Sequence, residues 1–208
     1  MSTEARTTKR SYNSARRAQQ AAQTRADVVA AAITLFGEQG WAGTTLAAIA
    51  EAAGVSVETI RNGFGSKKGL LRVAMDVAVA GDAEEVPLAE RAVFRSLGEG
   101  RLDERVQRVA ELAIAIQERS SGVWQAIVEA AGGDEEVDAW RLEMEAGRRI
   151  DVGRGLALVL GRDPDDRLVT VMWLMLGPEA YRKLVVDQGM SRDDYCELVA
   201  DLVLRLSG

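Results

Sequence analysis

The chain has 208 residues, of which 47% are apolar and 28% charged, a composition typical of a globular protein with one or two domains. Histidine is absent, which excludes Ser-His-Asp and Cys-His catalysis and every histidine metal site. No apolar run reaches the roughly 18 residues that a membrane span needs, and the N-terminus lacks the apolar core of a signal peptide. We therefore expect a cytoplasmic protein with no membrane partner, metal or cofactor, in which the single cysteine, Cys196, packs in a helix.

The formal net charge of −6 is unevenly distributed along the chain. Residues 1–80 carry ten Lys/Arg and six Asp/Glu, a net charge of +4, whereas residues 81–208 carry sixteen and twenty-six, a net charge of −10. A basic N-terminal module on an acidic body is compatible with DNA binding, because the local field at the contact face matters more than the total charge.

The first segment, residues 1–23, is polar, rich in Ala, Gln and Ser, and without apolar periodicity. We predict a flexible basic arm, which is either a disordered tail or a segment that follows phosphates or enters a minor groove. Its basic residues are Arg6, Lys9, Arg10, Arg16 and Arg17.

Apolar residues at helical spacing predict a first helix over about 25–39, which Gly40 ends. Its core-facing residues are Val28, Val29, Ala32, Ile33 and Phe36. Thr44 or Thr45 can cap a second helix. Its inner face consists of Leu46, Ile49, Ala50 and Ala53.

Ala50, Gly54 and Ile60 have the spacing of a helix-turn-helix. A small residue lets two helices cross closely, and a glycine four positions later can adopt the positive φ of a tight turn. A buried aliphatic residue then anchors the third helix, which Ser56 caps. Ser66 is expected to cap a fourth helix that reaches about residue 80. The residues left exposed on the third helix are Glu58, Thr59, Arg61 and Asn62.

The acidic break at residues 81–87 indicates a domain boundary, and only helical patterns follow it. One long pattern begins near residue 135 and contains three glycines, which predict a kink or an early end. These glycines are Gly147, Gly153 and Gly155. Asp163 and Pro164 predict the N-cap and first position of the next helix, and two more helices are expected over about 178–187 and from Ser191.

No strand pattern occurs, so the predicted fold class is all-α. A helix-turn-helix domain is expected over residues 24–80, including the linking fourth helix, and a helical domain over residues 81–208.

The segments LFGEQGW, TTLAAIAEAAGVS and FGSKKGLL, in this order, resemble the DNA-binding signature of the TetR family of transcriptional regulators. The resemblance covers about residues 24–71, roughly a quarter of the chain, and spans three helices with their turns. It implies a variable all-helical C-terminal domain that dimerises and often binds a small molecule.

The resemblance also implies that Thr45 and Lys67 contact DNA phosphates and that the third helix is the recognition helix. The physics agrees, because free N–H groups at a helix N-terminus favour an anion and a lysine beside them adds a positive charge. The DNA-binding residues that we expect are Thr45, Ser56, Glu58, Thr59, Arg61, Asn62 and Lys67.

Arg61 departs from the family pattern, which usually has a tyrosine at this position. An arginine can bind a phosphate as the tyrosine does, or it can contact a guanine edge bidentately, which discriminates bases by about 1–3 kcal/mol. Gly63 also replaces a larger residue and weakens the end of the recognition helix, so the operator preference stays open.

Several large side chains in the C-terminal half lie at helical spacing, where they belong either to a plain core or to a cavity for a small-molecule effector. The candidates for such a cavity are Trp124, Trp140, Met144, Met172, Trp173 and Met175. Polar contacts could come from Glu143, Arg148 and Asp151.

The helix expected over about 164–176 is too apolar to expose a face to water. Either other helices of the same subunit bury both sides, or a partner subunit covers one, as in the four-helix dimer seam of the family. The dimer-interface residues that we expect are Leu168, Met172, Tyr195, Val199, Leu202, Val203 and Leu206.

Together these patterns predict a homodimeric DNA-binding repressor, not an enzyme, which a small-molecule effector releases from a palindromic operator. The fourth helix, with one end at the DNA and the other at the body, is the expected lever. The alternative is a helical small-molecule-binding protein or enzyme on the same fold, with weak or no DNA binding.

Overall fold

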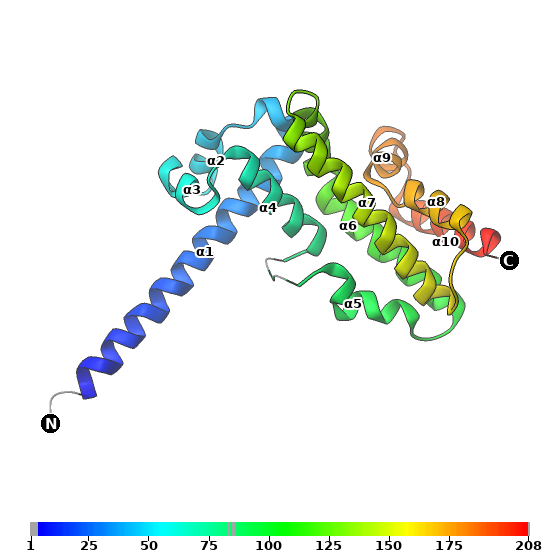
Figure 1. Cartoon of the computed structure of the whole chain (residues 1–208), viewed down its shortest axis with the longest axis horizontal. Helices are drawn as coiled ribbons and strands as arrows, with labels where there is room; N and C mark the ends of the chain where they lie inside the picture. Colours follow the sequence, from blue (N-terminus) through cyan, green and yellow to red (C-terminus); the bar gives the residue numbers. More distant parts are fainter. Residues whose placement is uncertain (1–3, 83, 85, 208) are drawn as a thin grey trace.

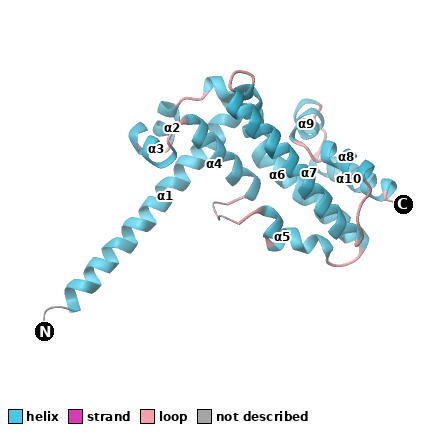
Figure 2. Ribbon diagram, in the orientation of Figure 1, coloured by secondary structure: helices cyan, strands magenta, loops and turns pink. Residues whose placement is uncertain are grey.

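The computed structural model describes residues 4–82, 84 and 86–207, with side chains described from residue 16 onward. Within these ranges every regular element is a helix and no strand occurs, which confirms the predicted all-α class (Figure 2). No helix in the described part of the chain is both long and apolar enough to cross a membrane. The elements are α1 (Glu4–Gly43), α2 (Leu46–Ala52), α3 (Val57–Phe64), α4 (Lys67–Ala80), η1 (Leu88–Glu90), α5 (Ala92–Arg95), η2 (Ser96–Gly98), α6 (Leu102–Ala131), α7 (Glu135–Leu160), α8 (Asp166–Met175), α9 (Pro178–Tyr181), η3 (Arg182–Asp187) and α10 (Arg192–Leu206).

The long helices α1, α6 and α7 organise the molecule (Figure 1). The N-terminal half of α1 projects from the body, and α2 and α3 lie beside it where it enters the body. Helix α4 connects this end to the α6–α7 pair, and α8, α9 and α10 lie on the other side of that pair. The arrangement therefore separates a small helical unit at one end from a larger bundle.

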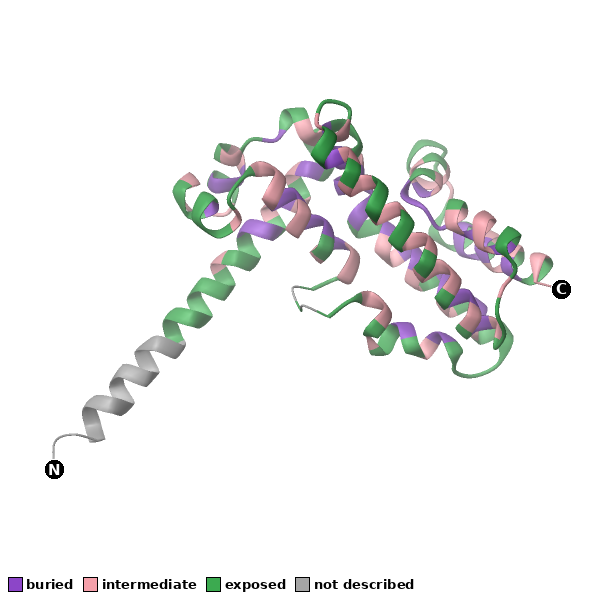
Figure 3. Cartoon of the chain, viewed as in Figure 1, coloured by how far each residue is buried: buried purple, intermediate pink, exposed green. Residues whose placement is uncertain are grey.

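Helix α1 begins at Glu4, so the prediction that the first helix starts near Arg25 is wrong. Residues 4–24 have no apolar face, but Ala, Arg and Gln are strong helix formers, and their propensity favours helix where packing is absent. The packed part agrees with the prediction, because the first buried residue is Val28 (Figure 3).

The predicted basic arm coincides with this N-terminal extension of α1. Residues 1–3 and the side chains of Arg6, Lys9 and Arg10 lie outside the described residues, whereas Arg16 and Arg17 are exposed on the helix. The flexibility of the segment and its contact with DNA stay predictions.

Gly40 interrupts α1 as predicted, with a φ of 67° that places it in the left-handed region. Just before this kink α1 crosses α6 at two glycines, and a Cβ on Gly122 would lie 2.7 Å from the Gly37 Cα. Just after it, the Trp41 backbone N–H donates to the Glu129 carboxylate at 2.8 Å. The crossing and this hydrogen bond hold the end of α1 against α6.

Two hydrophobic cores divide the described residues. The first core joins α1, α2, α3 and α4 to the C-terminal half of α6, with fully buried residues such as Phe36, Ile60 and Ile127. The second core joins the N-terminal half of α6 to α7, α8 and α10, and it includes the predicted buried Cys196. Because α6 contributes to both, the N-terminal helices do not form a core of their own. The predicted boundary at residue 81 stays a prediction.

Two predictions for the C-terminal half are wrong. Helix α7 runs without interruption through Gly147, Gly153 and Gly155, because packing against α6 and α8 outweighs the low helix propensity of glycine. The N-cap of α8 is Asp165 rather than Asp163, since the Asp165 carboxylate accepts from the Leu168 N–H at 2.7 Å.

Candidate functional site

The helix-turn-helix forms as its sequence predicts. Thr45 caps α2 by accepting from the Ala48 N–H at 3.1 Å, and Gly54 makes the turn with a φ of 65°. Ser56 then caps α3 by accepting from the Thr59 N–H at 3.1 Å. Ile60 is buried and fixes α3 against the first core. Thr44, the other predicted cap, is buried and donates to the carbonyls of Leu35 and Gly40.

The opposite face of α3 presents polar side chains to solvent. The exposed residues are Ser56, Glu58, Thr59, Arg61 and Asn62. No ion pair or side-chain hydrogen bond involves Arg61 among the residues that the structure describes, so its guanidinium is available to a ligand. The Thr59 hydroxyl instead lies 2.9 Å from the Ser56 hydroxyl. A further contact by Thr59 would therefore compete with the helix cap.

The Lys67 ammonium group contacts the protein at the start of α4. Its Nζ donates to the Trp41 carbonyl and lies 3.9 Å from the centre of the Trp41 ring, and burial lowers the pKa of Lys67. A phosphate contact at this point requires the amino group to leave Trp41 or to bridge both. The role of Lys67 toward DNA stays a prediction.

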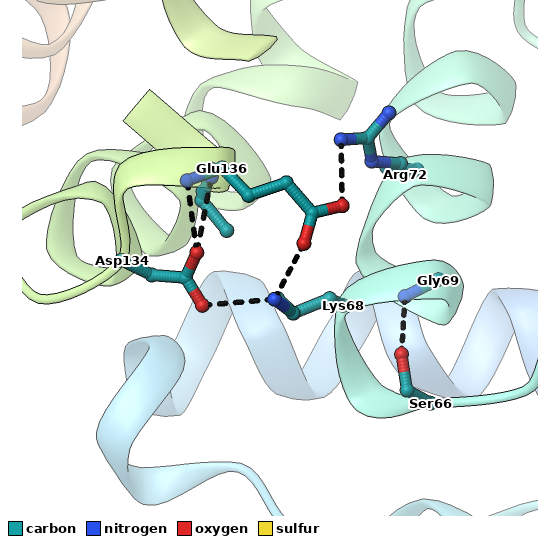
Figure 4. A network of polar contacts seen from close by, with 7 residues as sticks. Ser66, Lys68, Gly69, Arg72, Asp134 and Glu136 are labelled. Atoms are coloured by element: carbon teal, nitrogen blue, oxygen red, sulfur yellow. Dashed lines mark hydrogen bonds and ion pairs between the residues drawn. The ribbon is translucent and has the colours of Figure 1, made fainter. Parts of the chain in front are cut away.

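Lys68 belongs to a network of ion pairs between α4 and the N-terminal end of α7 (Figure 4). Its Nζ lies 3.0 Å from the Asp134 carboxylate and 2.8 Å from the Glu136 carboxylate, which also lies 3.5 Å from Arg72. These carboxylates raise the pKa of Lys68, and the Lys68 ammonium group lowers the pKa of Asp134. The network ties the start of α4 to the bundle.

Arg25 is a candidate contact that the sequence analysis did not identify. It lies on α1, and its Nη1 donates to the Gly63 carbonyl at 3.2 Å while its guanidinium lies 4.5 Å from the centre of the Phe64 ring. An open groove between α1 and α3 contains Arg17, Arg25 and Thr59. The sequence signal that could have identified Arg25 is its position about one helical turn before Val28, the first buried residue among the described side chains.

A cavity of about 310 Å³ lies in the bundle, between α4, α6 and α7 and beneath η1, α5 and η2. Of the six predicted cavity residues only Trp124 and Met144 line it. Trp124 also donates from Nε1 to the Glu179 carboxylate at 2.7 Å. Met75 and Val79 of α4 contribute to the wall, so the cavity adjoins the helix that leads to the helix-turn-helix.

The other four predicted cavity residues lie elsewhere. Trp140 packs on the first core beneath the Arg72 guanidinium, and Met172 is fully buried in the second core. Trp173 lies beneath the Arg148 guanidinium, and Met175 is the last residue of α8, with its carbonyl accepting from the Tyr195 hydroxyl. Helical spacing indicates that a residue is buried, but it does not distinguish a cavity wall from a filled core.

The polar side chains of the cavity wall come from α6 and α7. They are Gln117, Ser120, Arg148 and Asp151. Gln117 donates from Nε2 to the Leu176 carbonyl at 2.7 Å, and Arg148 donates from Nη1 to the Trp173 carbonyl at 2.6 Å. Burial lowers the pKa of Arg148. Glu143, named from sequence with Arg148 and Asp151, is exposed and does not line the cavity.

The second core of the same chain buries five of the seven residues predicted for the dimer interface, and the interface itself stays a prediction. They are Leu168, Met172, Tyr195, Val199 and Val203. Leu202 and Leu206 are half-buried. The apolar residues that α8 and α10 expose are Leu174 and Leu204, at 56% and 43%.

Comparisons with known proteins agree with this architecture. Residues 28–74 match the sequence model described as "Bacterial regulatory proteins, tetR family". A crystal structure of a TetR-family transcriptional regulator from Rhodococcus sp. superposes with a TM-score of 0.68 at 20% identity, covering 90% of this chain and 100% of that one. A transcriptional regulator from Rhodococcus sp. Rha1 gives 0.63 at 14% identity, covering 88% and 95%. Comparison with curated proteins finds no match.

The fold and the exposed recognition helix define a helix-turn-helix DNA-binding transcriptional regulator. Within that class, residues 28–74 match the DNA-binding region of the TetR family, and the whole chain shares its fold with the two regulators above. The matched family is one of regulators rather than enzymes.

Proposed function

We propose that the protein is a homodimeric repressor that binds a palindromic operator and leaves it when a small-molecule effector occupies the bundle cavity. The position of α4 carries this proposal. Met75 and Val79 of α4 line the cavity, while Lys67 begins the same helix next to the helix-turn-helix. A molecule in the cavity therefore contacts the helix that positions α3. Such a regulator acts in the cytoplasm.

On DNA, α3 would lie in the major groove, with Arg61 and Asn62 reaching base edges or phosphates. Thr45, Ser56 and the N-termini of α2 and α3 would bind phosphates, because their backbone N–H groups favour an anion. Arg17 and Arg25, on the groove between α1 and α3, would extend this basic surface.

The dimer would form through the outer face of α8 and α10. The exposed Leu174 and Leu204 give this face apolar character, and a two-fold axis would present the same face of both subunits. This dimer would hold two recognition helices at the spacing of two operator half-sites.

An effector can shift the protein away from the DNA-bound state only by the difference between its affinities for the two states. A shift of α4 would make the two states different at both sites, since the C-terminal half of α4 would contact the effector and its N-terminus adjoins the helix-turn-helix. The Lys68 network holds that N-terminus to the N-terminal end of α7, so a shift of α4 would change these ion pairs.

Selection from random duplexes at low salt, followed by titration at increasing salt, tests the proposal. We expect enrichment of a two-fold symmetric site, with binding that weakens steeply with salt because phosphate contacts release counterions. If no duplex is enriched, the repressor proposal fails.

A pair of lysine variants sharpens this experiment. Lys67→Ala should weaken binding to all sequences alike and reduce the slope of log K against log salt by about 0.9, the value for one phosphate contact. Lys183→Ala is the matched control, because Lys183 lies on η3, far from the helix-turn-helix (Figure 1), and pairs with Asp187 at 3.5 Å. Equal slopes for Lys67→Ala and the wild type would remove Lys67 from the phosphate contacts.

A further inference from the structure

The wall of the effector cavity contains a buried hydrogen-bond acceptor without a partner. Gln117 of α6 is only 4% exposed and lines the cavity. Its Nε2 donates to the Leu176 carbonyl at 2.7 Å, whereas its Oε1 is buried and has no partner among the described residues. Because a backbone carbonyl can only accept, the amide nitrogen must face Leu176, and this fixes the position of Oε1.

A buried carbonyl oxygen nearly always has a hydrogen-bond partner in a folded protein. The other polar groups of this wall are engaged, because Ser120 donates to the Ile116 carbonyl at 2.8 Å and Asp151 pairs with Arg154 at 3.2 Å. The rest of the wall is almost entirely apolar, including Leu97, Val109 and Leu156, and offers few partners to a bound water. The unmatched acceptor therefore indicates a donor on the molecule that fills the cavity.

Arg148 argues against a cationic ligand. Its Nη1 donates to the Trp173 carbonyl near the C-terminal end of α8, where the helix dipole already supplies partial negative charge. Its guanidinium also lies 5.1 Å from the centre of the Trp173 ring. Neither contact is an ion pair, so the positive charge of Arg148 would repel a cation. A ligand whose only polar group is an ionised carboxylate would bring no proton for Gln117.

We propose that the cavity binds a largely apolar molecule that carries a hydroxyl or N–H group and no positive charge, and that Gln117 Oε1 accepts its hydrogen bond. This inference rests on the proposed function, in which the cavity is the effector site. The volume of about 310 Å³ lies at the small end of the range for small-molecule pockets and suits a compact ligand of about two rings. Gln117 selects among such ligands by their donor.

Two pairs of probes test this selection on the full chain without DNA. The first is 4-phenylphenol and 4-methoxybiphenyl, and the second is 1-naphthol and 1-methoxynaphthalene. In each pair the ether has nearly the shape of the phenol but no donor. Isothermal titration should give the phenol roughly tenfold tighter binding, because the ether leaves Oε1 unpaired.

Gln117→Met assigns the preference to this residue. It keeps an unbranched side chain of similar length and removes the amide, so the phenol and ether should bind within about twofold of each other. Gln107→Met is the matched control, since Gln107 is exposed on the same helix and bonds to Glu111 at 3.1 Å. This variant should keep the wild-type preference. Thermal unfolding checks that both variants fold.

Equal affinities of phenol and ether for the wild-type chain would overturn the inference, whether or not Gln117→Met folds. A preference that persists in Gln117→Met would overturn it too, and so would failure of all four probes to bind. The duplex selection separates this result from the proposed function. A selected operator without a phenol preference removes only the donor inference, whereas a phenol preference without a selected operator removes the repressor.

Discussion

The recognition helix of the helix-turn-helix exposes its polar side chains to solvent, whereas the polar side chains of the cavity lie inside the bundle. On α3 the apolar Ile60 faces the core while Arg61 and Asn62 face water. In the bundle, Gln117 and Arg148 line a partly open cavity with mostly apolar walls. Water competes for every hydrogen bond on α3, so the free energy of DNA binding must come from many phosphate contacts. Inside the cavity, one acceptor can discriminate between ligands.

The two regions also differ in how tightly their helices pack. Near the helix-turn-helix, α1 and α6 approach so closely that no Cβ fits at Gly122. The bundle instead leaves a cavity of about 310 Å³ between its helices, whereas protein interiors normally have few voids larger than a water molecule. A filled core holds the recognition helix in place, and an unfilled one leaves room for a ligand.

Ile60→Ala should have the largest effect among four substitutions that test this comparison. Ile60 is 1% exposed and anchors α3, so its truncation should lower the free energy of unfolding by about 2–5 kcal/mol in urea titration. Asn62→Ala, on the exposed face of the same helix, should stay within about 0.5 kcal/mol of the wild type. Similar losses in both variants would contradict the assignment of the two faces.

Gly122→Ala tests the close crossing of α1 and α6. The added methyl group would lie 2.7 Å from the Gly37 Cα, a backbone atom that cannot move aside alone. We expect a loss of about 1–3 kcal/mol in the free energy of unfolding. Gly133→Ala meets no atom within 4 Å and serves as the control. If both variants unfold alike, the helices do not approach this closely.

Alkaline pH should destabilise the second core through its buried tyrosine. Burial raises the pKa of Tyr195, whose ordinary value is about 10, so the unfolded chain loses this proton at a lower pH than the folded chain does. The free energy of unfolding should therefore fall above about pH 10, by up to about 1.4 kcal/mol per pH unit for this group. Tyr195→Phe should flatten the decrease of the free energy of unfolding with pH. If urea titrations at several pH values give the same pH dependence for this variant and the wild type, Tyr195 is not the source of the decrease.

Gly147→Ala should have the smallest effect, and it should stabilise. Helix α7 continues through Gly147, and a Cβ there would meet no atom within 4 Å. Alanine should raise the free energy of unfolding by about 0.5–1 kcal/mol, because it loses less backbone entropy in a helix. A loss of stability would instead support the kink that the sequence predicts.

Local chemistry explains which helix boundaries were predictable. The side chains of the caps Thr45, Ser56, Ser66 and Ser191 each accept from the backbone N–H three residues on, so the signal and its partner lie in the same short segment. Asp163 and Asp165 flank Pro164 with similar local signals, and the chain uses the second. The α7 glycines were misleading for a related reason, since propensity is a weak term beside packing.

The functional residues also divide into those that the sequence could predict and those that it could not. The exposed face of α3 followed from the helical period, because Val57 and Ile60 determine which side is buried. The period could not separate Trp124 and Met144 of the cavity wall from Met172 of the filled core. The sequence likewise could not predict which face of α8 is exposed, because this helix is apolar on nearly all sides.

The sequence alone determined the all-α class, the helix-turn-helix and the polar face of its recognition helix. These depend on side chains and backbone groups a few residues apart, and on a helical period that the order of residues fixes. Only the tertiary structure decided that α8 and α10 bury most of their large side chains within the subunit, and that Gln117 meets a cavity. These features depend on which helices pack together and on the space that they leave between them.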